Sequence, residues 1–215
     1  AELAACQFVE LLVKHLRMKG LVVGPDFALG KGREGDIERL HSMGEEMGFT
    51  VEAVQPMVLD GVVVSSTAVR EAVAGGDVRK FRRLVGRYLV LGGEVVRGIE
   101  RGTKLGFPTA NLGIEPGRVV PVDGVYASWA HVGGARYSSA TNIGVRPTFD
   151  NGQRLAEVHI LDYKGSDLYG QQLRIELVER LREERRFDSV EELKAQLIQD
   201  VAEAKVVLEA ETREK

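Results

Sequence analysis

The stretch Leu155-Ala156-Glu157-Val158-His159-Ile160-Leu161-Asp162 alternates apolar and polar side chains with the period of a β-strand. Ala156, Val158 and Ile160 are expected on one face, and Glu157 and His159 on the other. Further short β-rich runs, separated by glycine turns, are expected near residues 88–97, 124–132, 136–144 and 172–181. Short antiparallel strands at this spacing predict a small closed barrel.

A helix is expected to follow the last of these strands. Ser189 and Glu192 form a capping box at its start. Its apolar residues recur along one stripe, at Val190, Leu193, Leu197, Val201, Ala204 and Leu208. The stripe predicts that this helix packs on the outside of the barrel.

The first 85 or so residues alternate between helical and strand-like patterns. An opening helix carries Ala5, Phe8, Val9, Leu12, Val13 and Leu16 on one face, and the strand Leu21–Val23 follows. A second helix buries Ile37, Leu40 and Met47, before a strand through Val51, Ala53 and Val54. This βαβ order predicts a Rossmann-like α/β unit with a parallel sheet. We therefore expect two domains, residues 1–86 (α/β) and 87–215 (all-β).

Composition restricts the class of partner. With 44% hydrophobic and 28% charged residues the chain is typical of a globular protein, and its net charge of −3 gives no cationic footprint for nucleic acid or an anionic membrane. One cysteine excludes an internal disulfide and a multi-thiolate metal site. We expect a cytoplasmic monomer that binds small molecules. Because the chain opens at Ala1 on a helix already in progress, a truncated or processed product is also expected.

The loop Arg101-Gly102-Thr103-Lys104-Leu105-Gly106-Phe107-Pro108-Thr109-Ala110-Asn111 combines glycines, cations and small oxygen-bearing side chains. Glycine lets the backbone approach phosphate oxygens, and Lys104 can neutralise their charge. Thr109 and Asn111 offer uncharged oxygens to a hard cation such as Mg²⁺. The loop therefore predicts a site for a polyphosphate and its metal, and the alternative is a basic surface turn that ends at a proline.

Phosphoryl transfer from such a site needs a group that takes a proton from the acceptor hydroxyl. Glu157 is the candidate base, because one oriented carboxylate beside a bound phosphate is sufficient for this chemistry. His159 could do the same task. Alternatively, both are solvated polar residues of a strand.

These segments resemble the signature of riboflavin kinases. The resemblance begins with Val96-Arg97-Gly98 and the loop 101–111. It continues, in the family's order, through Gly124–Tyr126, Asn142–Thr148, Glu157–His159, Asp167–Gly170 and Leu181–Ser189. The series covers the whole second half of the chain and implies a six-stranded barrel with a C-terminal helix.

The resemblance also implies roles for individual residues. The expected reaction is Mg²⁺-dependent transfer of the ATP γ-phosphate to the ribityl 5′-hydroxyl of riboflavin, which yields FMN. Glu157 would be the base, and Thr109 and Asn111 would hold the metal. The remaining nucleotide site would comprise Gly98, Gly102, Thr103, Lys104 and Tyr169. Arg182, Arg185 and Phe187 would border the flavin.

The first half resembles part of the FMN adenylyltransferase module that bacterial FAD synthetases fuse to this kinase. The resemblance rests on Gly24–Phe27, Gly30–Arg33 and Val64–Arg70. Ser65, Ser66 and Thr67 at a helix start, with Arg70 one turn further, could bind a nucleotide phosphate or simply cap the helix. The family's His-x-Gly-His element is absent from this sequence, so FAD synthesis is not expected of it. The alternatives to a kinase are an FMN adenylyltransferase and a binding module without catalysis.

Overall fold

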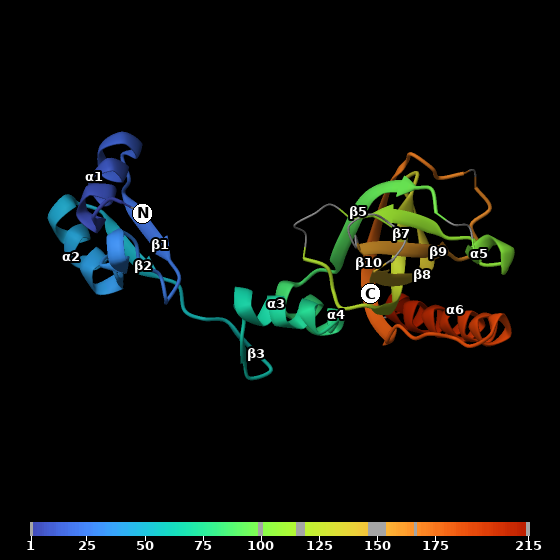
Figure 1. Ribbon diagram of the computed structural model, residues 1–215. Coiled ribbons are helices and arrows are strands. Elements are labelled where there is room, and N and C mark those ends of the chain that lie inside the picture. Colours follow the sequence, from blue (N-terminus) through green and yellow to red (C-terminus); the bar gives the residue numbers. More distant parts are fainter. Residues whose placement is uncertain (1, 99–100, 115–118, 146–153, 166, 214–215) are drawn as a thin grey trace. The chain divides into compact units, whose positions relative to one another are not determined.

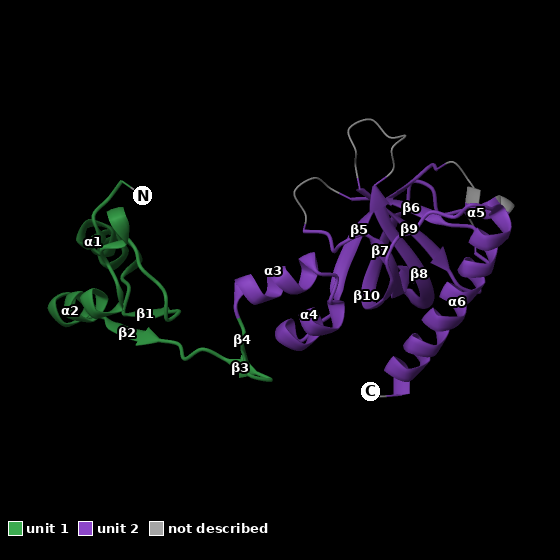
Figure 2. Cartoon of the chain, turned by 60° about the horizontal axis from the view of Figure 1, so that its bottom comes forward, with its two compact units in different colours: residues 1–64 green, residues 65–215 purple. Residues whose placement is uncertain are grey.

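The computed structural model describes residues 2–98, 101–114, 119–145, 154–165 and 167–213, without the side chains of Arg101 and Lys104. The chain forms two compact units, residues 1–64 and 65–215 (Figures 1 and 2). The predicted domain boundary lies between residues 86 and 87, whereas the compact units meet between residues 64 and 65. The boundary at 86 and 87 stays a prediction.

The first unit is a small α/β arrangement. Helix α1 (Ala5–Leu16), strand β1 (Gly20–Val23), the 3₁₀ turn η1 (Lys31–Arg33), helix α2 (Ile37–Met47) and strand β2 (Thr50–Ala53) follow in order. Strands β1 and β2 pair in parallel, as the βαβ pattern predicts. A short hairpin, β3 (Val58–Leu59) and β4 (Val62–Val63), completes the unit.

The core of this unit lies between the two helices and the sheet. Ala5 and Val9 of α1 are buried with Leu40, Met43 and Phe49. Phe8 and Leu16, which were predicted on the same face as Ala5, are 40% and 73% exposed. The stripe prediction is wrong for these two residues, because Phe8 lies at the margin of the buried arc and Leu16 is the last residue of the helix.

Two helices precede the barrel in the second unit, α3 (Ser66–Ala74) and α4 (Val78–Val85). Ser65 Oγ accepts a hydrogen bond from the Ala68 backbone N–H at 3.2 Å and so caps α3. Asp77 caps α4 in the same way, at 2.8 Å from the Lys80 nitrogen. Val78 of α4 is buried with the barrel core.

Six antiparallel strands form a closed barrel in the order β10-β5-β6-β9-β8-β7. They are β5 (Leu89–Val96), β6 (Ala110–Gly113), β7 (Gly124–Val132), β8 (Ala135–Val145), β9 (Arg154–Ile160) and β10 (Gln172–Arg182), with the one-turn helix α5 (Arg101–Lys104) between β5 and β6. This confirms the six-stranded barrel. Of its strands, β6 has no counterpart among the runs proposed from β-propensity, because its four residues include asparagine and glycine.

The alternation in β9 is confirmed. Ala156, Val158 and Ile160 join the core inside the barrel, while Glu157 and His159 lie on the outer face. The long helix α6 (Val190–Arg213) covers part of that outer face, and Ala204 and Leu208 in its second half are fully buried against it. No helix in the described part of the chain is both long and apolar enough to cross a membrane.

Candidate active site

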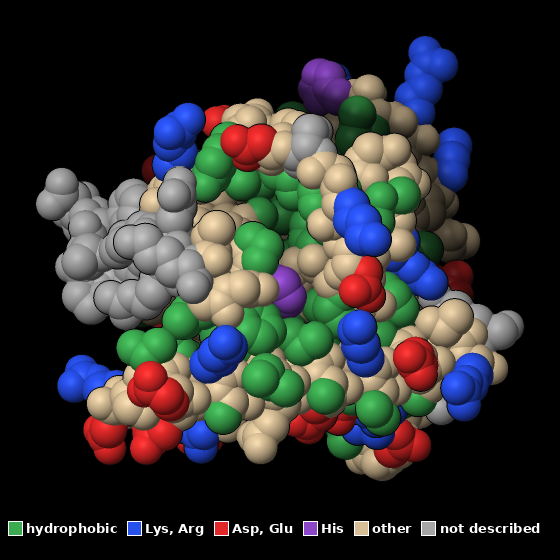
Figure 3. All heavy atoms as spheres, turned by 90° about the vertical axis from the view of Figure 1, so that its right-hand side faces the viewer, with side chains coloured by type: hydrophobic (Ala, Val, Ile, Leu, Met, Phe, Trp, Pro, Cys, Tyr) green, Lys and Arg blue, Asp and Glu red, His purple; other side chains and the backbone are tan. Residues whose placement is uncertain are grey.

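A pocket of about 920 Å³ lies on the outer face of the barrel. One wall is the outer face of β7, β8 and β9, and another is the loop from α5 to β6. The segment 182–189 and the first half of α6 close the remaining sides. Figure 3 shows the hollow on the face that carries α5, with apolar side chains gathered in it and charged side chains around its rim. This size suits a drug-sized or nucleotide-sized ligand.

The stripe on α6 explains why the pocket is apolar. Ser189 caps the helix, because its Oγ accepts from the Glu192 backbone N–H at 3.1 Å, while the Glu192 carboxylate accepts from the Asp188 backbone N–H at 3.3 Å, one residue before the position that a capping box predicts. Leu193 and Leu197 in the first half of the helix line the pocket, and Val201 both lines it and packs against the buried cluster on the outer face of the barrel. Val190 lines it as well and is 57% exposed. The prediction that this helix packs on the outside of the barrel holds for Val201, Ala204 and Leu208, whereas Val190, Leu193 and Leu197 of the stripe line the pocket.

The register of the strands brings the polar residues of the site into one row. Asn111 of β6 lies directly opposite Glu157 of β9, and Glu157 lies opposite Asn142 of β8. The row continues through Val125 of β7 to Arg182 of β10. Residues directly opposite each other in an antiparallel pair share a face, with Cβ atoms about 5 Å apart. Residues separated by up to 71 positions in the chain therefore form one belt around the outer face.

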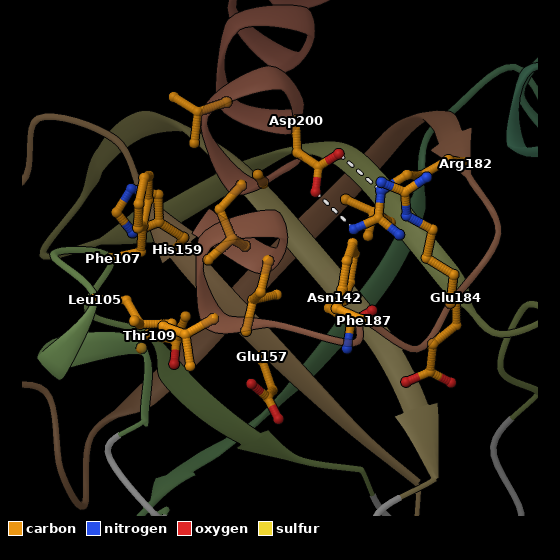
Figure 4. A pocket seen from close by; sticks show the side chains of 18 of the residues that line it. Leu105, Phe107, Thr109, Asn142, Glu157, His159, Arg182, Glu184, Phe187 and Asp200 are labelled. Carbon is orange, nitrogen blue, oxygen red and sulfur yellow. Dashed lines mark hydrogen bonds and ion pairs between the residues drawn. The ribbon is translucent and has the colours of Figure 1, made fainter. Parts of the chain in front are cut away.

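Thr109 and Glu157 line the same pocket (Figure 4). Gly102 lines it as well. The loop is held tightly here. A Cβ on Gly102 would collide with the carbonyl oxygen of Phe107 and would lie 3.4 Å from Thr109 Oγ1. Only glycine allows this approach without a backbone shift, which accounts for a glycine at this position of the loop.

Asn111 lies beneath the loop and is 4% exposed. A Cβ on Gly98 would stand 2.7 Å from Asn111 Cγ, so Gly98 and the Asn111 amide are in close contact. Asn111 Oδ1 is buried and has no hydrogen-bond partner among the described residues. A buried carbonyl oxygen of this kind needs a donor or a cation.

The donor set fits a divalent cation that arrives with a phosphate ligand. Thr109 and Asn111 supply neutral oxygen atoms, which Mg²⁺ accepts. No group of three His, Cys, Asp or Glu side chains in the described ranges could hold a metal by itself. The charge of such a cation would therefore have to be balanced mainly by the ligand, as in sites where substrate phosphates complete the coordination.

His159 fixes the loop from the side of β9. Its Nδ1 lies 2.8 Å from the Pro108 carbonyl oxygen, and its ring meets Phe107 edge to face at 5.4 Å between centroids. A carbonyl oxygen can only accept, so Nδ1 carries the proton in this contact. His159 thus holds the residue next to Thr109, a role that the sequence did not indicate.

The predicted flavin residues form the opposite wall, around Phe187. The Arg182 guanidinium carbon lies 5.8 Å from the Phe187 ring centroid, and that of Arg185 lies 4.7 Å from it. Arg182 donates two hydrogen bonds to the Asp200 carboxylate, drawn in Figure 4, from Nε at 2.8 Å and from its terminal nitrogen at 2.7 Å. All four residues line the pocket.

The remaining predicted residues lie outside this cavity. Gly98, Thr103, Asn111 and Tyr169 are not among the described residues that line it. Tyr169 packs against the barrel core, and its ring lies 5.2 Å from the Arg97 guanidinium, beside Gly98 in the chain. The Lys104 side chain and residues 146–148 lie outside the described residues. Ser65, Ser66, Thr67 and Arg70 lie at and within the start of α3, and their predicted nucleotide role stays a prediction.

Comparison with known proteins identifies the family of the chain. Residues 85–208 match the riboflavin kinase (Flavokinase) family, and residues 1–68 match the FAD synthetase family. A bifunctional riboflavin kinase/FMN adenylyltransferase of Escherichia coli strain K12 is 44% identical over 202 residues, which are 93% of this chain and 64% of that protein. The protein of the same description from Pseudomonas fluorescens is 43% identical over 207 residues, 95% of this chain and 66% of the relative.

A solved structure is also similar. A crystal structure described as a macrolide-efflux protein from Streptococcus pneumoniae superposes with a TM-score of 0.85 at 31% identity, over 95% of this chain and 66% of that one. The chain thus spans slightly less than two thirds of the length of each of these relatives. The match over residues 85–208 covers more than half of the chain, the whole barrel and the site built on it. The chain therefore belongs to the riboflavin kinase family and carries part of an FAD synthetase domain before its barrel.

Proposed function

We propose that this protein is a riboflavin kinase, which transfers the γ-phosphate of ATP to the ribityl 5′-hydroxyl of riboflavin and releases FMN and ADP. The observation that carries the proposal is the shared pocket. Thr109 at its phosphate end, Glu157 on its barrel wall and Phe187 at its apolar end all line one cavity. A flat, mostly apolar flavin ring suits an aromatic wall flanked by cations.

Thr109 and Asn111 would hold Mg²⁺ with the nucleotide, at the oxygen atoms described above. The metal would supply charge neutralisation at the transferring phosphate. Gly98 and Gly102 would let the backbone approach the phosphates, and Thr103, Lys104 and Tyr169 would complete the nucleotide site. The close packing around the two glycines supports the assignments of Gly98 and Gly102, and the unpaired amide oxygen supports that of Asn111.

Glu157 would take the proton of the ribityl hydroxyl. As that oxygen bonds to the γ-phosphorus, the bond from phosphorus to the β-bridging oxygen breaks and ADP leaves. The carboxylate accepts the proton, so the charges balance without a further acid. The apolar walls formed by Leu105, Phe107 and Leu193 would exclude water and so disfavour hydrolysis of ATP.

The reaction can be tested directly. The protein is incubated with riboflavin, ATP and MgCl₂, and chromatography separates riboflavin, FMN and FAD. We expect FMN and ADP in equal amounts. Tight riboflavin binding without ADP release would show a binding module instead, and would refute the kinase.

The same assay, started from FMN and ATP, tests the FMN adenylyltransferase alternative. The similarity of residues 1–68 to FAD synthetase is the reason to test this alternative. The four histidines of the sequence, His15, His41, His131 and His159, form no His-x-Gly-His element, so we expect no FAD. We also expect the enzyme to act as a cytoplasmic monomer, with neither nucleic acid nor membrane as a partner.

A further inference from the structure

Asp200 is a buried acid on α6, and nothing in the reaction described above uses it. It is 2% exposed and lies on the pocket side of the helix. Its Oδ1 accepts hydrogen bonds from Arg182 Nε at 2.8 Å and from Gln196 Nε2 at 2.7 Å, and its Oδ2 accepts from Arg182 at 2.7 Å. A buried carboxylate without such partners would be very unfavourable.

This network fixes the orientation of Arg182. Two parallel hydrogen bonds to one carboxylate hold the plane of the guanidinium, and its third nitrogen donates to the Glu183 carbonyl oxygen at 2.9 Å. Every nitrogen of the guanidinium therefore has a partner. Asp200 thus determines which way the face of Arg182 points in the pocket.

Gln196 extends the same network to the second arginine. Its Nε2 donates to Asp200, and its Oε1 accepts from the Arg185 guanidinium. Since Arg182 and Arg185 both lie against the Phe187 ring, two residues one turn apart on α6 hold the whole aromatic and cationic wall.

We propose that Asp200 and Gln196 are positioning residues of the flavin site, which act through Arg182 and Arg185. The inference rests on the proposed function, because it takes the wall around Phe187 to be the flavin subsite. It predicts that loss of the network weakens riboflavin binding and leaves nucleotide binding nearly unchanged, since Thr109 and Asn111 lie on other elements.

A purely stabilising role is the alternative, and α6 offers a matched control. Glu211, about three turns further along the helix, is 9% exposed and pairs with Arg82 and with the Tyr88 hydroxyl at 2.8 Å. It is also a buried acid that pairs with an arginine, but it does not line the pocket. Both Asp200→Asn and Glu211→Gln remove one buried charge from the same helix.

The experiment compares Asp200→Asn, Glu211→Gln and Gln196→Leu with the wild-type protein. Riboflavin binding is measured by fluorescence titration, and KM is measured separately for riboflavin and for ATP, with a thermal melt of each variant. We expect Asp200→Asn to weaken riboflavin binding about tenfold, the loss typical of a charged hydrogen bond, with a change in ATP KM below about twofold. Glu211→Gln should lower the melting temperature but keep the riboflavin affinity.

Equal riboflavin affinity in Asp200→Asn and Glu211→Gln would overturn the positioning role. If Asp200→Asn does not fold, Gln196→Leu decides: its side chain is only half-buried, and we expect a severalfold loss of riboflavin affinity. Unchanged affinity in that variant would equally overturn the proposal. Wild-type protein that binds riboflavin but forms no FMN would refute the kinase and leave this binding test intact, whereas wild-type protein that does not bind riboflavin would refute both.

Discussion

Substitution of Gly98 by alanine tests the phosphate end of the site through a single added carbon. That carbon would lie 2.7 Å from Asn111 Cγ and 2.9 Å from Asn111 Oδ1. Because carbon atoms in contact prefer a separation of about 3.5–4.0 Å, the amide would have to move by roughly 1 Å. Gly98 has no left-handed φ, so alanine fits its backbone and the effect is confined to this contact.

A displacement of about 1 Å in a group that positions a reacting centre can reduce the rate by about 10²-fold. We therefore expect Gly98→Ala to lower kcat/KM for FMN formation by about that factor, with an overpacking cost of about 1–3 kcal/mol in stability. Initial rates of FMN formation at saturating Mg²⁺ and a thermal melt measure both quantities.

Gly113→Ala is the matched control for this substitution. Gly113 lies two residues after Asn111 on β6, and a Cβ there would meet its nearest atoms at 3.9 Å, which is ordinary contact. We expect nearly wild-type activity in this variant. Equal activity of Gly98→Ala and Gly113→Ala would refute the reasoning that the buried Asn111 amide serves catalysis.

Four further predictions follow from the same structure. Glu157→Gln should lower kcat about 10²–10⁴-fold with riboflavin affinity retained, measured by FMN formation and fluorescence titration; wild-type turnover would exclude Glu157 as the base. Thr109→Ala should raise the Mg²⁺ concentration needed for half-maximal rate severalfold, and an unchanged requirement would remove Thr109 from the metal site. Leu208→Ala should destabilise the second unit by about 2–5 kcal/mol in denaturant unfolding, since Leu208 is fully buried, and a loss below about 1 kcal/mol would contradict this packing. Burial, and after it the hydrogen bond from its hydroxyl to Glu211, raises the pKa of Tyr88 to about 12. The contribution of the protonated Tyr88 to the free energy of unfolding is therefore complete below the unfolded pKa of 10.0 and is lost as pH rises from there to about 12. Tyr88→Phe should flatten the dependence of unfolding free energy on pH in this range, and an identical slope in the variant would contradict it.

Local patterns in the sequence predict much of the fold. The alternation in residues 155–162 places Glu157 on the outer face of the barrel, and the cap at Ser189 marks the start of α6. Both are local signals, because the period of a strand and the cap of a helix depend on residues close together in the sequence. The glycines of residues 101–111 also predict a loop there, without any knowledge of how the strands pair.

The parts that depend on pairing across the barrel could not be predicted in the same way. The short strand β6 forms only because β5 and β9 lie on either side of it, although asparagine and glycine disfavour strands. Asp200 was missed as well. The sequence could have indicated a buried acid only through the position of Asp200 between Leu197 and Val201 of the apolar stripe. That position does not reveal that its partner is Arg182.

The proposed reaction requires Thr109, Asn111 and Glu157 to serve one reaction centre. A crystal structure with riboflavin, Mg²⁺ and a non-hydrolysable ATP analogue would test it most directly. We expect the metal to contact Thr109 Oγ1 and Asn111 Oδ1 at about 2.1 Å, and the Glu157 carboxylate to lie within about 3.2 Å of the ribityl 5′-hydroxyl. A nucleotide bound outside the α5–β6 loop, or a ribityl hydroxyl far from Glu157, would contradict it.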